Sequence, residues 1–202
     1  MDASAGGHTM GHVVRHEETE HKLRVGIGLY VLVDVTFVAA LFMAYIFLRA
    51  YNTQGLWFKG IQPPSVGVIT VLVLILVASG ACYYFSERAL REDNQTLFRG
   101  LMAAAFVLML ITFVGQIIFM AHLPFTFSDG AFASSFIMLS GYHVFHMFIA
   151  TMIGIGLVNR AWHARYTPAN TIGITVIGYF WYWTVIMGVA LWLLLIVLPP
   201  QI

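Results

Sequence analysis

The sequence predicts an all-α, polytopic membrane protein with five transmembrane helices in one bundle. Of its 202 residues, 60% are hydrophobic and 9% are charged, whereas a soluble domain needs far more charge on its surface. Five apolar runs each reach the roughly 20 residues that cross a hydrocarbon core of about 30 Å as an α-helix. These runs are residues 25–48, 66–85, 100–121, 132–158 and 172–198.

The chain divides into a polar tail, residues 1–24, and a transmembrane domain, residues 25–202. The tail lacks a small-residue cleavage site, so we expect the first span to remain in the mature protein. The connections are short, and Pro63, Pro64 and Pro124 mark two of them. They leave no room for a second folded domain.

Three histidines recur every fourth residue in the tail, at His8, His12 and His16. On a helix they would share a face and could bind a metal or collect protons. The polar and partly acidic composition of the segment favours the alternative, a disordered and solvated tail.

The basic residues predict the orientation, because they collect on the cytoplasmic side of membrane proteins. Eight of the ten lysines and arginines lie in the tail and in the second and fourth connections. We therefore expect the N-terminus in the cytoplasm and the C-terminus outside. The cytoplasmic set is Arg15, Lys22, Arg24, Arg88, Arg91, Arg99, Arg160 and Arg165, and the outer set is Arg49 and Lys59.

The sequence offers few groups for covalent chemistry. Its one cysteine, Cys82, cannot form an internal disulfide, and no paired cysteines offer a zinc or iron–sulfur site. There is no phosphate-binding loop, dinucleotide glycine pattern, nucleophile–base pair or set of catalytic carboxylates. We therefore expect no catalytic, cofactor-binding or metal-binding residue on this chain.

The fourth span carries polar groups, Tyr142, His143 and His146, within a run (130–159) that has no charged residue. A polar group in hydrocarbon costs free energy without a partner, so these side chains should face the protein interior. Haem ligation is disfavoured, because two histidines one turn apart cannot take both faces of one haem. Metal ligation with Asp34 is an alternative to the hydrogen-bonded structural pair that we favour.

Asp34 is the only acidic residue within any span, and a carboxylate there must be protonated, paired or hydrated. It could be a proton relay, or a clamp that hydrogen-bonds a neighbouring helix through His143 or His146. Gln116 is expected to hydrogen-bond between helices. The candidate buried polar cluster is therefore Asp34, Gln116, Tyr142, His143 and His146.

Small and aromatic residues predict how the helices pack. Ala150 and Gly154 form a pair of small residues one turn apart, where another helix can approach closely. The tryptophans at or near the span ends are expected to anchor the helices at the headgroup level. They are Trp57, Trp162, Trp181, Trp183 and Trp192.

Two stretches of the sequence have a distinctive order of residues. Residues 140–147 read Ser-Gly-Tyr-His-Val-Phe-His-Met, which resembles the TGFHxxHV signature in subunit III of the haem–copper oxidases. Residues 33–49 resemble the SEVMFFxxLFxAYxxLR segment of the same family. Asp34 stands where that family usually has a buried glutamate.

Two further stretches resemble the same family in order and spacing. Residues 87–91 together with Asn94 are similar to its AxxALRxGN connection, and Gln116 matches the glutamine of its FLxxQ segment. The similarity extends over nearly all five spans. The positions that match family motifs, besides the candidate cluster, are Tyr45, Arg49, Glu87, Arg88, Arg91, Asn94 and Gly141.

The last span departs from the family pattern, which has a glutamate followed by WYWHFVD. Here Ile177 replaces the glutamate, Thr184 the histidine and Met187 the aspartate. Phe119 also stands where the family often has a glutamate. The chain therefore resembles a divergent member, or a sister branch such as the accessory protein of nitric oxide reductase.

The resemblance implies a non-catalytic subunit of a proton-pumping oxidase that reduces oxygen to water in an aerobic respiratory electron transport chain. In this family the haems and copper reside in subunits I and II, and five-helix members resemble those of bacterial oxidases. Family roles include binding phospholipid, supporting proton uptake into subunit I and prolonging the life of the enzyme. The electron donor, cytochrome c or a quinol, is chosen by another subunit.

The implied partners are subunit I as the main contact, subunit II, a small subunit IV, membrane lipids and a respiratory supercomplex, with no nucleic acid. The implied location is the bacterial cytoplasmic membrane. A rival interpretation is a small proton-coupled transporter with Asp34 as its carrier group. A membrane-anchor cytochrome is disfavoured by the histidine count.

Overall fold

The computed structural model describes residues 5–51, 57, 60–62, 64–163, 166–167 and 171–197. Within these ranges, side chains are described from residue 18 to residue 195. Each element in these ranges is a helix, and five helices are long and apolar enough to cross a membrane. The predicted all-α fold with five spans is confirmed. The helices are α1 (Ala5–Ala50), α2 (Val66–Arg91), α3 (Gln95–Ala121), α4 (Ala131–His163), α5 (Ile172–Trp192) and a short π-helix, η1 (Leu193–Val197).

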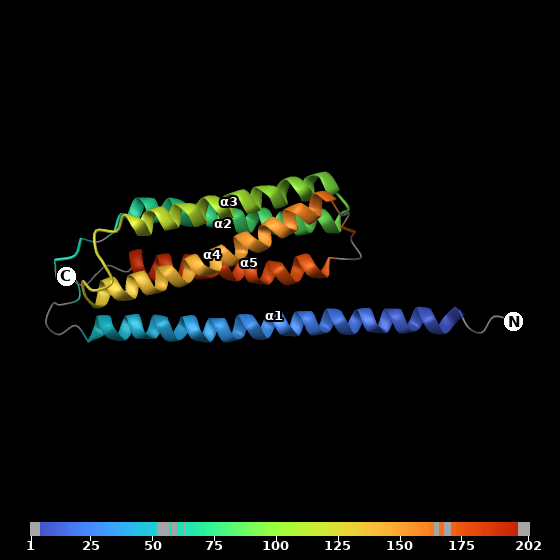
Figure 1. Cartoon of the computed structure of the whole chain (residues 1–202), viewed down its shortest axis with the longest axis horizontal. Coiled ribbons are helices and arrows are strands. Elements are labelled where there is room, and N and C mark those ends of the chain that lie inside the picture. The colour runs from blue at the N-terminus through green and yellow to red at the C-terminus, as the bar shows by residue number, and fades with distance from the viewer. Residues whose placement is uncertain are drawn as a thin grey trace.

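The helices are arranged as a four-helix group with a fifth helix along one side (Figure 1). Helices α2 and α3 lie side by side, and α4 crosses the group obliquely between α3 and α5. Helix α1 packs mainly against α5 and α4, whereas α2 packs against α3 and α5. The position of α1 therefore depends on what it contacts on α4 and α5.

Helix α1 has 46 residues and begins at Ala5, which corresponds to a length of about 69 Å, more than twice the hydrocarbon thickness. Its N-terminal end extends beyond the other helices in Figure 1. The prediction of a disordered tail was therefore wrong for this segment. Ion pairs one turn apart favour the helix there, Lys22 with Glu18 at 3.5 Å and Arg24 with Glu20 at 3.9 Å.

The tail histidines His8, His12 and His16 lie in the part of α1 whose side chains are outside the described residues. Their predicted metal or proton binding stays a prediction. The polar residues 18–24, by contrast, are part of a continuous helix that leads into the first span.

The turn between α2 and α3 is tighter than predicted, because α2 continues to Arg91 and α3 begins at Gln95. Asp93 adopts the left-handed conformation (φ 53°) that reverses the chain direction. The Asn94 side chain then accepts a hydrogen bond from the backbone N–H of Leu97 at 3.1 Å, which caps the N-terminus of α3. The family-motif residue Asn94 therefore has a local structural role.

An aromatic core joins α5 to α2 and α3. The rings of Tyr83 and Trp181 stack at 5.1 Å, and the Tyr83 hydroxyl donates to the carbonyl of Ile174 at 2.8 Å. The Trp181 indole N–H donates to Ser79 at 3.2 Å, and Ser79 donates to the carbonyl of Ala105 at 2.8 Å. Both buried aromatic residues therefore satisfy their polar atoms inside the bundle.

Helices α3 and α4 approach closely at the predicted pair of small residues. A Cβ atom on Gly154 would lie 2.7 Å from Cδ2 of Phe106, which is too close for a side chain at that position. Ala150 is fully buried one turn earlier. The expectation that these two small residues allow close packing is confirmed.

Candidate functional site

The site begins with a polar residue on the packed face of α1. Asp34, Val38 and Tyr45 follow helical spacing and are 6%, 5% and 3% exposed, while most of the large apolar residues of α1 are exposed. Because α1 is apolar on all sides, only this face can carry a carboxylate away from lipid. The spacing therefore places Asp34 against α4 and α5.

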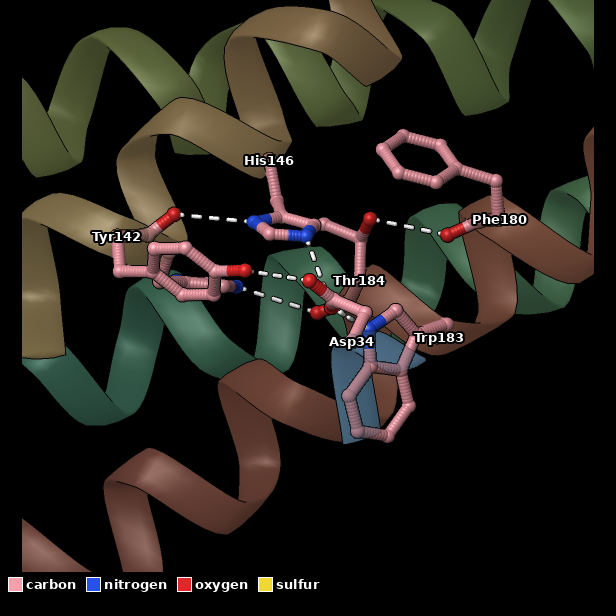
Figure 2. A network of polar contacts seen from close by, with 7 residues as sticks. Asp34, Tyr142, His146, Phe180, Trp183 and Thr184 are labelled. Atoms are coloured by element: carbon pink, nitrogen blue, oxygen red, sulfur yellow. Dashed lines mark hydrogen bonds and ion pairs between the residues drawn. The ribbon is translucent and has the colours of Figure 1, made fainter. Parts of the chain in front are cut away.

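The Asp34 carboxylate joins three helices (Figure 2). Its Oδ1 accepts a hydrogen bond from the Tyr142 hydroxyl on α4. Its Oδ2 accepts one from the Trp183 indole N–H on α5 at 2.5 Å and lies 3.0 Å from Nε2 of His146 on α4. We call Asp34, Tyr142, His146 and Trp183 the Asp34 cluster.

The contact between Asp34 and His146 defines what this cluster can do chemically. His146 Nδ1 lies 3.1 Å from the Tyr142 carbonyl, which only accepts, so Nδ1 is the donor. Nε2 lies at ion-pair distance from Asp34 but lacks the alignment of a hydrogen bond. An ion pair or a hydrogen bond between these two atoms would require a proton on the imidazole or on the carboxyl group.

The His146 ring is held by its aromatic neighbours. It stacks on Phe180 of α5 with ring centroids 5.7 Å apart and an interplanar angle of 19°. The centroid of the Tyr142 ring, one turn earlier on the same face of α4, lies 4.7 Å from that of His146. His146 and Asp34 are both buried, so this pair is shielded from bulk water.

His143, one turn earlier on α4, faces a different partner. Its Nε2 donates to the backbone carbonyl of Thr184 at 3.1 Å, and the Thr184 hydroxyl donates within α5 to the carbonyl of Phe180 at 3.0 Å (Figure 2). Among the described residues, neither His143 nor Gln116 contacts the Asp34 carboxylate. Of the five predicted cluster members, the structure brings together Asp34, Tyr142 and His146.

Trp183 is the member that the sequence interpretation missed. It was expected at the headgroup level, but it donates to Asp34, and Trp192 similarly donates to Thr70 at 3.0 Å. Trp181 is fully buried. The position of these tryptophans in the sequence could have indicated burial. Trp181 and Trp183 lie nine and eleven residues after Ile172, the first residue of α5, and so near the middle of the helix.

A second buried carboxylate, that of Glu87, lies between α2 and α5. Glu87 was predicted to lie in a connection, but α2 continues past it and leaves it only 9% exposed. Its Oε2 accepts a hydrogen bond from the Tyr182 hydroxyl at 2.5 Å. The carboxylate lies against α5, since a Cβ atom on Gly178 would be 3.4 Å from Oε2.

At three positions where the sequence departs from the family pattern, apolar side chains pack where the family pattern has polar residues. Met187 is 1% exposed within an apolar cluster, and Ile177 packs against the aromatic core. Phe119 packs against the same apolar cluster as Met187. Ile177 is the sequence neighbour of Gly178, which packs against the Glu87 carboxylate of α2.

The remaining family-motif positions lie near the helix ends or in packing contacts. Tyr45 packs edge to face against Trp57, with ring centroids 5.3 Å apart. Arg88 pairs with Glu92 at 3.0 Å on the surface. The other positions are Arg49 in the last turn of α1, Arg91 in the last turn of α2, and Gly141, where an added Cβ would meet only Met120 at 3.9 Å.

Metal binding is not favoured by the geometry of the Asp34 cluster, because both oxygens of the carboxylate already face protein donors. Among the described residues, no group of three or more His, Cys, Asp or Glu side chains could hold a metal ion. The cluster is therefore best described as a clamp between helices.

Comparisons with known proteins identify the family. The profile of cytochrome c oxidase subunit III matches residues 2–198. The cytochrome c oxidase subunit 3 of Marchantia polymorpha is 30% identical over 183 residues, which is 87% of this chain and 66% of that protein. The corresponding protein of Corynebacterium diphtheriae is 24% identical over 173 residues, 84% of each chain.

The cytochrome c oxidase subunit 3 of Prototheca wickerhamii is 31% identical over 183 residues, 87% of this chain and 67% of that protein. The chain thus spans about two thirds of the length of the Marchantia and Prototheca relatives. The family profile, in contrast, covers nearly the whole chain. This integral membrane protein of five apolar helices therefore belongs to the cytochrome c oxidase subunit III family.

Proposed function

We propose that this chain is the non-catalytic subunit III of a proton-pumping haem–copper oxidase in an aerobic respiratory chain. The observation that carries the proposal is the family match over residues 2–198. The relatives are named cytochrome c oxidase subunit 3. The chain itself would add no haem or copper, which belong to the partner subunits in this proposal.

The proposed partners are subunit I as the main contact, subunit II and a small subunit IV. Large apolar side chains are exposed along α1, where they suit lipid or another membrane subunit. We place the protein in a bacterial cytoplasmic membrane with its N-terminus in the cytoplasm. The excess of basic residues at that end of the helices supports this orientation.

We propose that the Asp34 cluster fixes α1 against α4 and α5 and thereby supports proton uptake by subunit I. The support is the set of contacts that α1 makes there with Tyr142, His146 and Trp183. A subunit whose first helix separated from the bundle would lose the surface that it presents to its partner.

Phospholipid binding is also part of the proposal. A cleft of about 300 Å³ between α4 and α5 is lined by apolar residues and by Arg160, whose guanidinium lies 5.4 Å from the centroid of the Tyr166 ring. Gly156 and Gly173 widen the same cleft. Apolar walls with one cation at the edge suit an acyl chain with an anionic headgroup.

The experiment is purification of the protein from its native membrane in mild detergent, through an affinity tag on residues 1–24. An untagged strain is the matched control. We expect large haem-bearing and copper-bearing chains to co-purify, with oxygen consumption and haem bands in the reduced-minus-oxidised spectrum. The accepted electron donor then distinguishes a cytochrome c oxidase from a quinol oxidase.

Other outcomes contradict the proposal. Nitric oxide reduction without oxygen consumption would assign the chain to the accessory branch. A folded, haem-free protein without partners would overturn the oxidase proposal, and proton flux in liposomes would then support the transporter. A b-type band from the isolated chain would instead indicate haem ligation by its own histidines.

A further inference from the structure

We propose that the four-helix group contains a hydration site, in which at least one ordered water molecule binds Gln116, Ser140 and His143 inside the membrane. This site is separate from the Asp34 cluster and is independent of the proposed oxidase function. The argument starts from a cavity between α2, α3, α4 and α5 and from the polar groups that line it.

The cavity has the right size for water. The volume that the centre of a water molecule can occupy inside it is about 20 Å³. One buried water needs roughly 10–15 Å³ of volume defined in the same way. Most of its wall is buried and apolar, contributed by residues such as Leu72, Leu76 and Leu191. A cavity with only such a wall would stay dry, so the polar part of the wall decides what binds.

Three polar side chains from facing helices line this cavity. Gln116 comes from α3, and Ser140 and His143 lie one turn apart on the same face of α4. Among the described residues, neither the Gln116 amide nor the Ser140 hydroxyl has a hydrogen-bond partner, although Ser140 is only 3% exposed. The alternative bond of a helical serine, to the carbonyl four residues earlier, is not made either.

His143 presents an acceptor to the same space. Its Nε2 donates to the Thr184 carbonyl, so the other ring nitrogen of a neutral imidazole, Nδ1, is an acceptor. Among the described residues, Nδ1 has no donor. A water molecule can donate to Nδ1 and to the Gln116 carbonyl oxygen while it accepts from the Ser140 hydroxyl.

The energetic argument follows from the location. Each polar group that is left without a partner inside the membrane raises the free energy of the folded protein, and buried water usually makes about three hydrogen bonds. One water molecule with these three partners therefore removes three penalties at a small cost in entropy. Helix α4 then carries two polar sites, the Asp34 cluster at His146 and a hydrated site at His143.

The cavity also offers an internal control. Thr112 lines the same wall, but its hydroxyl already donates to the carbonyl of Leu108 at 2.9 Å. Thr112→Val therefore changes the wall without removing a water ligand. Ser140→Ala combined with Gln116→Leu removes two of the three ligands and leaves His143 in place.

The test is a cryo-electron microscopy map of the protein as purified from its membrane, with any subunits that accompany it, at a resolution that shows buried waters elsewhere. We expect a density peak within hydrogen-bond distance of at least two of the three groups, its loss in the double variant and its retention in Thr112→Val. A cavity without density, a peak that persists in the double variant, or the elongated density of an acyl chain would each overturn the proposal.

A second measurement decides the matter if the double variant does not assemble. In protein with ¹⁵N-labelled histidine, solid-state NMR should show magnetisation transfer from water to the His143 ring, and the single variant Ser140→Ala should weaken it. Equal transfer in the two proteins, or none in the native protein, would reject the hydration site.

Discussion

The Asp34 carboxylate on α1 accepts a hydrogen bond at 2.5 Å from the Trp183 indole on α5, 149 residues further along the chain. His146 of α4 approaches the same oxygen. Since α1 packs mainly against α5 and α4, one carboxylate connects the first helix to both of its neighbours. The polar cluster thus connects the first helix to the rest of the fold.

Asp34→Leu should weaken the attachment of α1. The substitution leaves the Tyr142 hydroxyl, the Trp183 N–H and His146 without their shared acceptor, and breaking a buried pair in this way costs about 3–5 kcal/mol. We expect a lower unfolding temperature of the purified protein, a lower yield of assembled complex and unchanged haem spectra in the complex that remains.

The matched control for this change is Asp34→Asn. The amide keeps one acceptor oxygen for Tyr142 or Trp183. The unfolding temperature of this variant should therefore lie between those of the native protein and the leucine variant. Unchanged yield, activity and unfolding temperature in Asp34→Leu would show that the cluster does not hold the helix.

Glu87→Ala should destabilise the contact between α2 and α5. The Tyr182 hydroxyl, which donates to Glu87 at 2.5 Å, would lose its partner, at a cost of about 1–3 kcal/mol. Thermal unfolding in detergent measures the change. Glu92→Ala removes the exposed pair with Arg88 and should leave the unfolding temperature unchanged; an equal effect of the two variants would argue against a buried role for Glu87.

Gly154→Ala should be destabilising although alanine is a better helix former than glycine. The added Cβ atom would lie 2.7 Å from Phe106 and 3.3 Å from Trp181, and such overpacking costs about 1–3 kcal/mol. Gly156→Ala is the matched control, because nothing lies within 4 Å of its Cβ position. Equal unfolding temperatures for the two variants would contradict the close approach of α3 and α4.

The loop between α3 and α4 should lose stability in acid. The backbone N–H and the hydroxyl of Thr126 donate to Asp129 at 2.6 and 2.9 Å, and these bonds hold the pKa of the Asp129 carboxyl below its usual value. Because the folded pKa is the lower one, the contribution is present above the unfolded value of roughly 3.9 and is lost as the pH falls through the folded pKa.

Asp129→Asn tests this dependence through the unfolding temperature as a function of pH. The native protein should be more stable than the variant at about pH 6, and the difference should shrink below about pH 4. A difference that stays constant over this range would mean that the Asp129 charge does not contribute to the stability of the loop.

The helices could be predicted from the sequence because the bilayer constrains them strongly. A span needs about 20 apolar residues and must satisfy its backbone internally, so five long runs predict five helices. Helix ends were less certain, since α2 continues past Glu87 into residues that composition assigned to a connection. Charged residues there do not end a helix; they only mark where it leaves the hydrocarbon.

The partners within the site were harder to predict. Asp34 and the fourth span were correctly expected to carry buried polar residues, but His143 and His146 differ by roughly 60° around the helix axis. Which of them meets Asp34 depends on the angle at which α4 crosses the bundle, and a sequence pattern does not contain that angle. Trp183 was missed for a similar reason, because an indole serves equally well as a headgroup anchor and as a buried donor.

The distance along the chain between Asp34 and its donors has a consequence for biosynthesis. At ~5–20 residues per second, the ribosome adds Trp183 roughly 7 to 30 s after Asp34. During that interval α1 must enter the membrane with a carboxyl group whose hydrogen-bond donors on α4 and α5 do not yet exist, at an insertion cost of about 2.5–3.5 kcal/mol. The helix that is synthesised first is therefore the last to reach its final contacts in the folded subunit.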